Sequence, residues 1–165
     1  MIELVREHTC CFTGHRKITG DTLWLRFQVQ QEVLRLYQRG VTTFLTGGAL
    51  GFDTLAAKEV LRLRDSYVSD LALAVVIPCW GQESRWREED QAFYQSILRR
   101  ADDCIMTGEL YTPECMFVRN RYLVEHSACC VAWLEPGRRG GTNYTVSYAR
   151  SKGLEVVNLF EKNRP

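Results

Sequence analysis

The stretch Thr46-Gly47-Gly48-Ala49-Leu50-Gly51-Phe52-Asp53 decides the fold class, because it follows an apolar run and leads into a segment with helical periodicity. Two consecutive glycines let the backbone adopt positive φ and approach a ligand without an intervening Cβ. Gly51 lets the helix pack closely on the strand that precedes it. The free N–H groups from Phe52 onward face the turn, where a phosphate is the usual occupant. The stretch therefore predicts a strand, an anion-binding turn and a helix in succession.

Apolar runs and helical stripes alternate along the rest of the chain. The apolar runs predict strands over residues 9–13, 41–46, 71–77, 104–107, 128–134 and 154–159. Helical periodicity predicts a first helix that Asp21 or Thr22 caps and Gly40 closes, followed by helices over residues 53–64, 84–100, 113–127 and 142–152. In the third of these helices we expect Trp86, Phe93 and Ile97 to face inward.

This alternation of strands and helices implies right-handed βαβ crossovers. We therefore predict an α/β protein, a Rossmann-like three-layer α/β/α sandwich with a mostly parallel sheet. The length of 165 residues suits one domain, which we expect to span residues 1–165.

Composition limits the classes of function. A formal net charge of +1 is too small to attract nucleic acid or a membrane surface without specific contacts. The first residues carry acids where a signal peptide has a basic start, and no later run approaches the length of a membrane span. Seven cysteines without a C-x-x-C pair are expected to be reduced core residues, and no metal site is predicted. We expect a cytoplasmic protein.

Ligands of parallel α/β sheets bind beyond the carboxyl ends of the strands. The expected strand ends here carry glycine, arginine, histidine, tryptophan and glutamine, which together describe a pocket with phosphate donors and an aromatic surface. We therefore predict that a ligand contacts Gly14, His15, Arg16, Gly47, Gly48, Gly51, Phe52, Asp53, Trp80, Gln82, Gly140, Gly141 and Thr142.

Several of these residues have two possible interpretations. Arg16 is either a counter-charge for phosphate or a solvated loop cation, and His15 is either a structural residue or a hydrogen-bond partner and proton carrier. Thr142, at a helix start, can both cap the helix and reach a bound anion. Asp53 either complements the positive end of its helix or binds a ribose hydroxyl. We expect Arg138-Arg139 to form a solvated loop edge.

The chain lacks residues that several common classes of enzyme require. The strand after the glycine turn ends in Ile77-Pro78-Cys79 without the acidic residue that holds a dinucleotide ribose, which disfavours a standard NAD-dependent dehydrogenase. No Walker lysine follows the glycines, and no G-x-S-x-G sequence is present. Spacing alone identifies no catalytic group.

The motifs together resemble the YpsA-like family of the SLOG superfamily, which also includes the LOG nucleotide phosphoribohydrolases and the DNA-processing protein DprA. The resemblance runs from about Phe12 to Leu159. It rests on Thr13-Gly14-His15-Arg16, Gly47 to Asp53, Trp80-Gly81-Gln82-Glu83 with Trp86, Arg119-Asn120-Arg121-Tyr122, and Gly140-Gly141-Thr142 with Thr145 and Tyr148-Ala149.

The resemblance implies a Rossmann-like fold that binds a nucleotide or nucleotide-derived ligand, such as NAD, ADP-ribose or a nucleoside monophosphate. It adds Asn120 to the expected ligand-binding residues. A homodimer is expected at the level of the family, and the family's link to bacterial cell division or stress implies a cell-division partner protein. A role in binding single-stranded DNA, as in DprA, is disfavoured by the charge balance.

Catalysis is left open. LOG enzymes carry a motif similar to P-G-G-x-G-T-x-x-E, in which the glutamate assists cleavage of the N-glycosidic bond. This chain has Thr145 at the position of that glutamate. Arg119 and Arg121 are the candidates to stand in for the arginine of the LOG pattern, and Asp53 and Glu135 are the nearest carboxylates to substitute for the glutamate, although no motif places them. Three hypotheses follow: a nucleotide-binding sensor or regulator, an N-glycosidic hydrolase, and an interaction protein of cell division or stress with a vestigial pocket.

Overall fold

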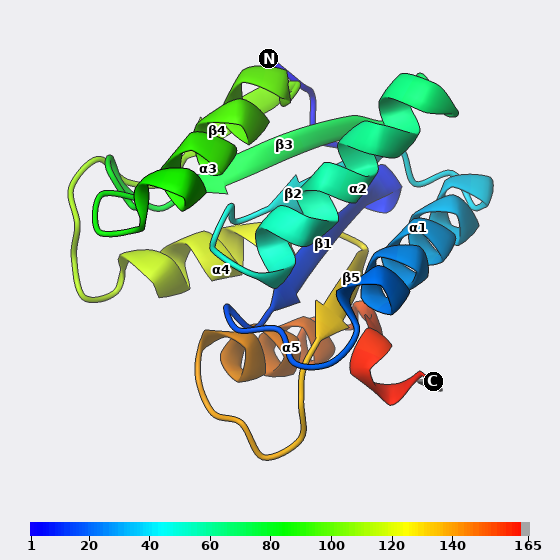
Figure 1. Ribbon diagram of the computed structural model, residues 1–165. Coiled ribbons are helices and arrows are strands. Elements are labelled where there is room, and N and C mark those ends of the chain that lie inside the picture. The colour runs from blue at the N-terminus through cyan, green and yellow to red at the C-terminus, as the bar shows by residue number, and fades with distance from the viewer. Residues whose placement is uncertain (163–165) are drawn as a thin grey trace.

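The computed structural model describes residues 1–162 and confirms the Rossmann-like sandwich (Figure 1). One sheet contains six parallel strands in the order β4-β3-β2-β1-β5-β6. The strands are β1 (Thr9–Gly14), β2 (Thr43–Thr46), β3 (Ala72–Ile77), β4 (Asp103–Met106), β5 (Cys129–Trp133) and β6 (Glu155–Asn158). The helices are α1 (Thr22–Gln38), α2 (Phe52–Ser66), α3 (Glu88–Arg100), α4 (Cys115–Glu125) and α5 (Gly141–Ser151), with short 3-10 helices η1 (Arg6–His8) and η2 (Leu159–Glu161). No helix in this part of the chain is both long and apolar enough to cross a membrane.

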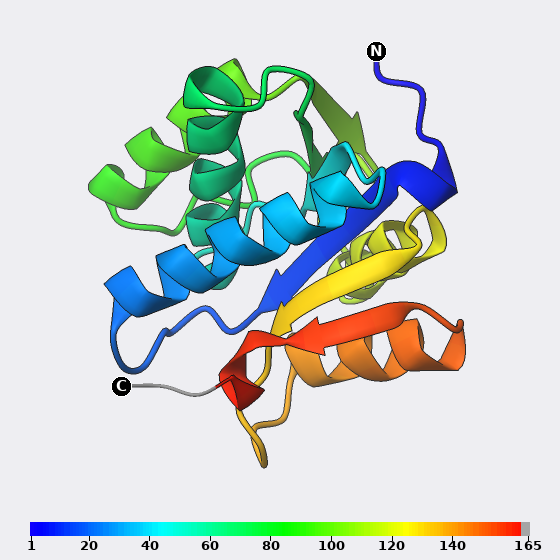
Figure 2. The same ribbon diagram turned by 90° about the vertical axis from the view of Figure 1, so that its right-hand side faces the viewer.

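Helices cover both faces of the sheet, because both faces of its strands are apolar. Figures 1 and 2 show α1 and α2 on one side and α4 and α5 on the other. Alternate residues of each strand supply the two cores: Phe12 and Val75 pack with α1, α2 and Ile97 of α3, whereas Leu45 and Val76 pack with α4 and α5.

The strand order creates a switch point between β1 and β5. The chain builds β1 to β4 outward in one direction, then returns through α4 to place β5 on the free side of β1. The two strands pair in parallel from Cys10 opposite Cys129 to Gly14 opposite Trp133. The crossovers from β1 and β5 therefore diverge at the carboxyl ends of these strands, which is where such sheets bind ligands.

The predicted start of the third helix was wrong. Residues 78–87 form a series of turns, in which Ser84 N donates to Gly81 O and Trp86 N donates to Glu83 O, and α3 begins only at Glu88. The predicted inward face was also partly wrong, because Tyr94 is buried and Phe93 is 37% exposed. Pro113 lies before α4 and not within it.

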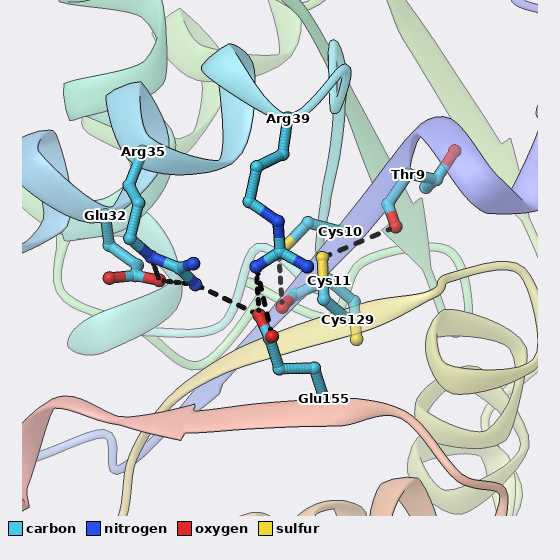
Figure 3. A network of polar contacts seen from close by, with 8 residues as sticks. All are labelled: Thr9, Cys10, Cys11, Glu32, Arg35, Arg39, Cys129 and Glu155. Atoms are coloured by element: carbon cyan, nitrogen blue, oxygen red, sulfur yellow. Dashed lines mark hydrogen bonds and ion pairs between the residues drawn. The ribbon is translucent and has the colours of Figure 1, made fainter.

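The amino end of the sheet is held by an ion cluster between α1 and β6, which Figure 3 shows. Arg35 bridges Glu32 and Glu155, with 3.0 Å from its Nη2 atom to Glu155 Oε1. Arg39 Nη1 lies 3.0 Å from Glu155 Oε2. These contacts fix the edge strand β6 to the helix that covers it.

The contact between the loop after β1 and the start of α2 depends on Gly51. Phe52 N donates to the carbonyl oxygen of His15 at 3.1 Å. Gly51 has φ +82°, and a Cβ at this position would collide with the carbonyl oxygen of Arg16. The missing side chain thus lets the two segments touch.

We expect Gly51→Ala to destabilise the protein more than Gly153→Ala. Both glycines have positive φ, +82° and +79°, but a Cβ at Gly153 has nothing within 4 Å. Gly153→Ala should therefore reduce the free energy of unfolding by about 1 to 2 kcal/mol through backbone strain alone. Gly51→Ala should cost about 2 kcal/mol more because of the added collision. Urea unfolding measures both, and equal losses would contradict the role given to Gly51.

Candidate ligand-binding site

A cavity of about 460 Å³ lies at the switch point, beyond the carboxyl ends of β1 and β5. Its volume is within the range of small-molecule sites. The cavity is lined by Thr13, Gly14, His15, Arg16, Ala49, Asp53, Pro113, Met116, Phe117, Arg119, Asn120, Arg138, Arg139, Gly140, Gly141 and Thr142.

The cavity brings together many of the residues predicted from the sequence. Those on its wall are Gly14, His15, Arg16, Asp53, Asn120, Gly140, Gly141 and Thr142, with Arg119 from the catalytic candidates. Those that do not line it are Gly47, Gly48, Gly51, Phe52, Trp80, Gln82, Arg121 and Glu135. Contact with a ligand stays a prediction for both groups.

The glycine turn lies beneath the cavity, where it makes room for Arg119. Arg119 Nη1 donates to the carbonyl oxygen of Gly47 at 2.6 Å, and it lies 3.5 Å from that of Val76. A Cβ at Gly47 would lie 2.5 Å from the same nitrogen. Because position 47 is glycine, there is space for the Arg119 guanidinium group at the ends of β2 and β3.

Three backbone N–H groups of this turn, those of Gly48, Ala49 and Phe52, are already bonded. Gly48 N donates to Thr46 Oγ1 and Ala49 N donates to Asp53 Oδ2, each at 3.3 Å. Phe52 N donates to the carbonyl oxygen of His15, as described above. These N–H groups position Asp53 and the loop after β1, and a phosphate would have to displace the bonds to reach them.

Asp53 and Arg119 form the charged floor of the cavity. They are 6% and 5% exposed. Burial raises the pKa of the Asp53 carboxyl from its ordinary 3.8 to about 6, while Arg119, the Ala49 N–H group and Arg16 oppose the shift. Burial also lowers the pKa of the Arg119 guanidinium, which Asp53 opposes. A carboxyl that titrates near neutral pH in a cavity is typical of a functional group.

The amino end of α5 forms a second polar wall. Among residues 1–162 no side chain caps this helix, so the N–H groups at Gly141 and Thr142 face the cavity region without a capping oxygen. Asn120 adds a donor: its Oδ1 atom accepts from Arg119 Nε at 2.8 Å, and its Nδ2 atom lies 3.6 Å from the position of a Cβ at Gly141. This wall suits an anion.

Two arginines expected at a solvated loop edge also line the cavity. Arg138 is half-buried and pairs with Glu135 through a 3.2 Å contact from Nη1 to Oε2, and Arg139 is exposed beside it. With Arg16 and Arg119, four arginines line the same cavity as one buried carboxyl, that of Asp53. The cavity therefore favours anionic ligands.

The third wall is apolar and was not predicted. Pro113, which lies just before α4, and Met116 and Phe117 of its first turn line the cavity. The Phe117 ring is held edge-on by Tyr144 of α5, with ring centroids 4.8 Å apart and planes at 78°. A planar base can stack on such a wall.

His15 joins the loops after β1 and β5. Its Nε2 atom accepts a hydrogen bond from Glu135 N at 2.9 Å, which requires this nitrogen to be unprotonated. Burial and Arg138 lower the pKa of the imidazole, and Glu135 opposes them. The ring also packs edge-on against Trp133 at 5.7 Å. These contacts give His15 a structural role at the cavity wall.

The remaining candidates lie elsewhere. Trp80 is 72% exposed, and Gln82 bonds the carbonyl oxygen of Gly47 and the hydroxyl of Tyr94. Arg121 bonds the hydroxyl of Tyr144 on the outer side of α4 and α5. Burial of Arg119 could have been inferred from its spacing, because Cys115, Arg119 and Leu123 recur every four residues on one buried face.

The fold and the cavity define a Rossmann-like α/β protein with a cationic cavity at the switch point of its sheet. The YpsA family model, described as the YspA SLOG family, matches residues 13–157. The chain therefore belongs to this family, as the resemblance of its motifs predicted.

Similar proteins agree with this assignment. A UPF0398 protein of Halalkalibacterium halodurans is 31% identical over 141 residues, which cover 84% of this chain and 72% of that protein. A UPF0398 protein of Bacillus cereus strain B4264 is 30% identical over 132 residues, covering 79% and 71%. The X-ray structure of TM1055, a structural genomics target, matches with a TM-score of 0.56 and 14% identity over 90% of this chain and 71% of that chain, a likeness of fold.

We expect Asp53→Asn to stabilise the protein at neutral pH. The carboxyl has a pKa of about 6 in the folded state and an ordinary value of 3.8, so folding holds the proton more tightly than the unfolded chain does. Stability should thus fall as pH rises from about 4 to 6 and stay low above it. The amide does not ionise, and the variant should gain about 1 to 3 kcal/mol at pH 7.5.

Urea unfolding between pH 4 and 8 checks this expectation. The gain should shrink as pH falls to about 4, where the folded carboxyl is protonated and the unfolded one is becoming so. Asp70→Asn, which changes an exposed carboxylate beside Tyr37, is the matched control and should alter stability little. If Asp53→Asn is less stable than the wild type at pH 7.5, the claim that the buried Asp53 carboxylate destabilises the fold is wrong.

Proposed function

We propose that this protein binds a nucleotide or nucleotide-derived ligand, such as ADP-ribose, NAD or a nucleoside monophosphate, as a cytoplasmic sensor or regulator. The observation that carries the proposal is the convergence of four guanidinium groups and an uncapped helix start on a cavity with an apolar wall. A nucleotide combines these two chemistries in one molecule. Seven free cysteines suit a reducing compartment.

The arrangement of the walls suggests how such a ligand would lie. The phosphate would accept hydrogen bonds from the amino end of α5 and pair with Arg16 and Arg139. The base would stack on the wall at Phe117. Asp53, which lines the same cavity, would accept a hydrogen bond from a ribose hydroxyl.

Gly141→Glu tests the phosphate position. A Cβ at Gly141 meets only Asn120 Nδ2, at an ordinary contact distance of 3.6 Å, so the substitution should fit the fold and place a carboxylate at the helix start. We expect affinity for ADP-ribose or AMP, measured by calorimetry, to fall at least about tenfold through charge repulsion.

Asn143→Glu is the matched control, because it adds the same charge to the same helix turn at an exposed residue outside the cavity lining. It should retain binding close to that of the wild type. The proposal fails if a broad nucleotide panel neither binds nor raises the melting temperature of the wild type, or if both variants bind equally well.

A second candidate, an N-glycosidic hydrolase, is favoured by Asp53. In such a reaction water adds to C1′ of the ribose and the base leaves with a proton, which a buried carboxylic acid can supply. A pKa of about 6 keeps part of the Asp53 population protonated near neutral pH. Thr145, at the position of the LOG glutamate, is buried and donates its hydroxyl to Gly141 O at 2.8 Å, so it does not replace that acid.

Chromatography after incubation with AMP or NAD distinguishes a hydrolase from a binding protein. A hydrolase should release free adenine or nicotinamide, at a rate that falls as pH rises above about 6 and by at least about a hundredfold in Asp53→Asn. If no free base appears at high protein concentration while binding is intact, the hydrolase is excluded and the sensor hypothesis remains. Equal release by wild type and Asp53→Asn would remove Asp53 from catalysis.

A further inference from the structure

Two pairs of cysteines face each other across β1 and β5, away from the cavity. Cys10 lies opposite Cys129, and Cys11 lies opposite Cys130, in the register of these parallel strands. Successive residues of a strand point to opposite faces of the sheet, so the first pair belongs to the core under α1 and α2 and the second to the core under α4 and α5. All four are free thiols. The two pairs therefore share strands and register and differ in their surroundings.

The register brings the members of each pair close enough for a disulfide. Neighbouring strands lie about 4.8 Å apart, and disulfides join Cα atoms that are about 4.4 to 6.8 Å apart. The thiols of Cys10 and Cys129 are within hydrogen-bonding reach of each other. Cys129 Sγ also donates to the carbonyl oxygen of Thr9 on β1 at 3.8 Å. A bond between the two sulfurs therefore requires rotation of side chains and not movement of the strands.

Cys129 lies beside the ion cluster that joins α1 to β6. It is opposite Glu155 in the sheet, and Figure 3 shows it near the guanidinium group of Arg39. The hydrogen bond with Cys10 lowers the pKa of the Cys129 thiol. Arg39 and Arg35 act in the same direction, whereas burial and Glu155 oppose them. A lowered pKa increases the fraction of thiolate, the nucleophilic form of cysteine, so Cys129 is the member of the pair that attacks an oxidant.

The surroundings of the second pair have the opposite effect. Cys11 and Cys130 are both 0% exposed, whereas Cys129 keeps 5% of its surface exposed. The hydrogen bond with Cys11 and burial raise the pKa of the Cys130 thiol well above its ordinary value. Buried thiols with a raised pKa are inert. Cys11 and Cys130 thus provide an internal control on the same two strands.

We propose that Cys10 and Cys129 form a disulfide that a hydroperoxide makes and a dithiol reverses. The bond would join the two strands whose carboxyl ends carry walls of the cavity. It would lie at the opposite, amino end of these strands. The proposal therefore holds whether or not the cavity binds a nucleotide.

The reaction has two steps. The Cys129 thiolate attacks the terminal oxygen of the hydroperoxide, the O–O bond breaks, and Cys129 becomes a sulfenic acid. The alcohol, or water where the oxidant is hydrogen peroxide, leaves with the proton that the thiol had released. The Cys10 sulfur then attacks the Cys129 sulfur, and the S–O bond breaks as the hydroxyl group leaves with the Cys10 proton as water. The two sulfurs together lose two electrons, which the hydroperoxide gains, and thiol–disulfide exchange with a dithiol returns them.

Oxidation of the full chain with hydrogen peroxide tests the proposal. After unfolding, alkylation and digestion, mass spectrometry of the unreduced peptides identifies the bonded cysteines. Fragmentation between Cys10 and Cys11, and between Cys129 and Cys130, distinguishes the two pairs in the wild type without any substitution. We expect the bond between Cys10 and Cys129 to form at least about tenfold faster than the bond between Cys11 and Cys130, and dithiothreitol to remove it.

Two double variants give the matched comparison, with circular dichroism as the check on folding. Cys11→Ala with Cys130→Ala keeps the proposed pair and should form the disulfide at the rate of the wild type. Cys10→Ala with Cys129→Ala keeps the control pair and should form its bond at least about tenfold more slowly. Equal rates for the two pairs would overturn the proposal. It would also be overturned if peroxide oxidised other cysteines of the wild type while Cys10 and Cys129 remained without a bond.

Discussion

Arg119 occupies the space that a side chain at position 47 would fill, and the rest of the site depends on this contact. Its guanidinium bonds the carbonyl oxygen of Gly47 at the end of β2, and its Nε atom orients Asn120 towards the start of α5. One buried cation thereby connects the glycine turn, helix α4 and helix α5. A glycine-rich turn that resembles a phosphate cradle here seats an arginine.

The cost of this arrangement appears at Asp53. A carboxyl buried beside Arg119 has its pKa raised to about 6, so the attraction of the cation does not offset the loss of hydration. Proteins retain such strained charges where they serve a site, and stability is then lower than the fold would allow. Asp53 therefore indicates a functional site more clearly than any glycine of the turn does, because its buried carboxylate lowers the stability of the fold.

The strands and most helix positions could be predicted from the sequence, because apolar runs and helical stripes record burial directly. The order of the strands could not, since hydrophobic pattern does not record on which side of β1 the chain places β5. The start of α3 was misplaced because residues 78–87 form turns whose polar residues also suit a helix. Phe93 and Tyr94 are neighbours of similar character, and Tyr94 is the buried one, in contact with Trp86 and Gln82 of the turns that the sequence did not predict.

The site was predictable where it follows strand ends and was missed where it depends on packing between helices. Gly14 to Arg16 and Gly140 to Thr142 meet because β1 and β5 are neighbours. Met116 and Phe117 read as ordinary helix residues, and their place on the cavity wall follows from the angle at which α4 approaches the sheet. Arg138 and Arg139 lie in a loop whose direction no local pattern fixes.

A crystal structure of the protein with AMP tests the proposed ligand site most directly. We expect AMP in the cavity between β1 and β5, with phosphoryl oxygens bonded to N–H groups of Gly141 or Thr142 and the base against Phe117. AMP bound to the N–H groups of the Gly47-Gly48 turn, or found outside this cavity in crystals soaked to saturation, would contradict it.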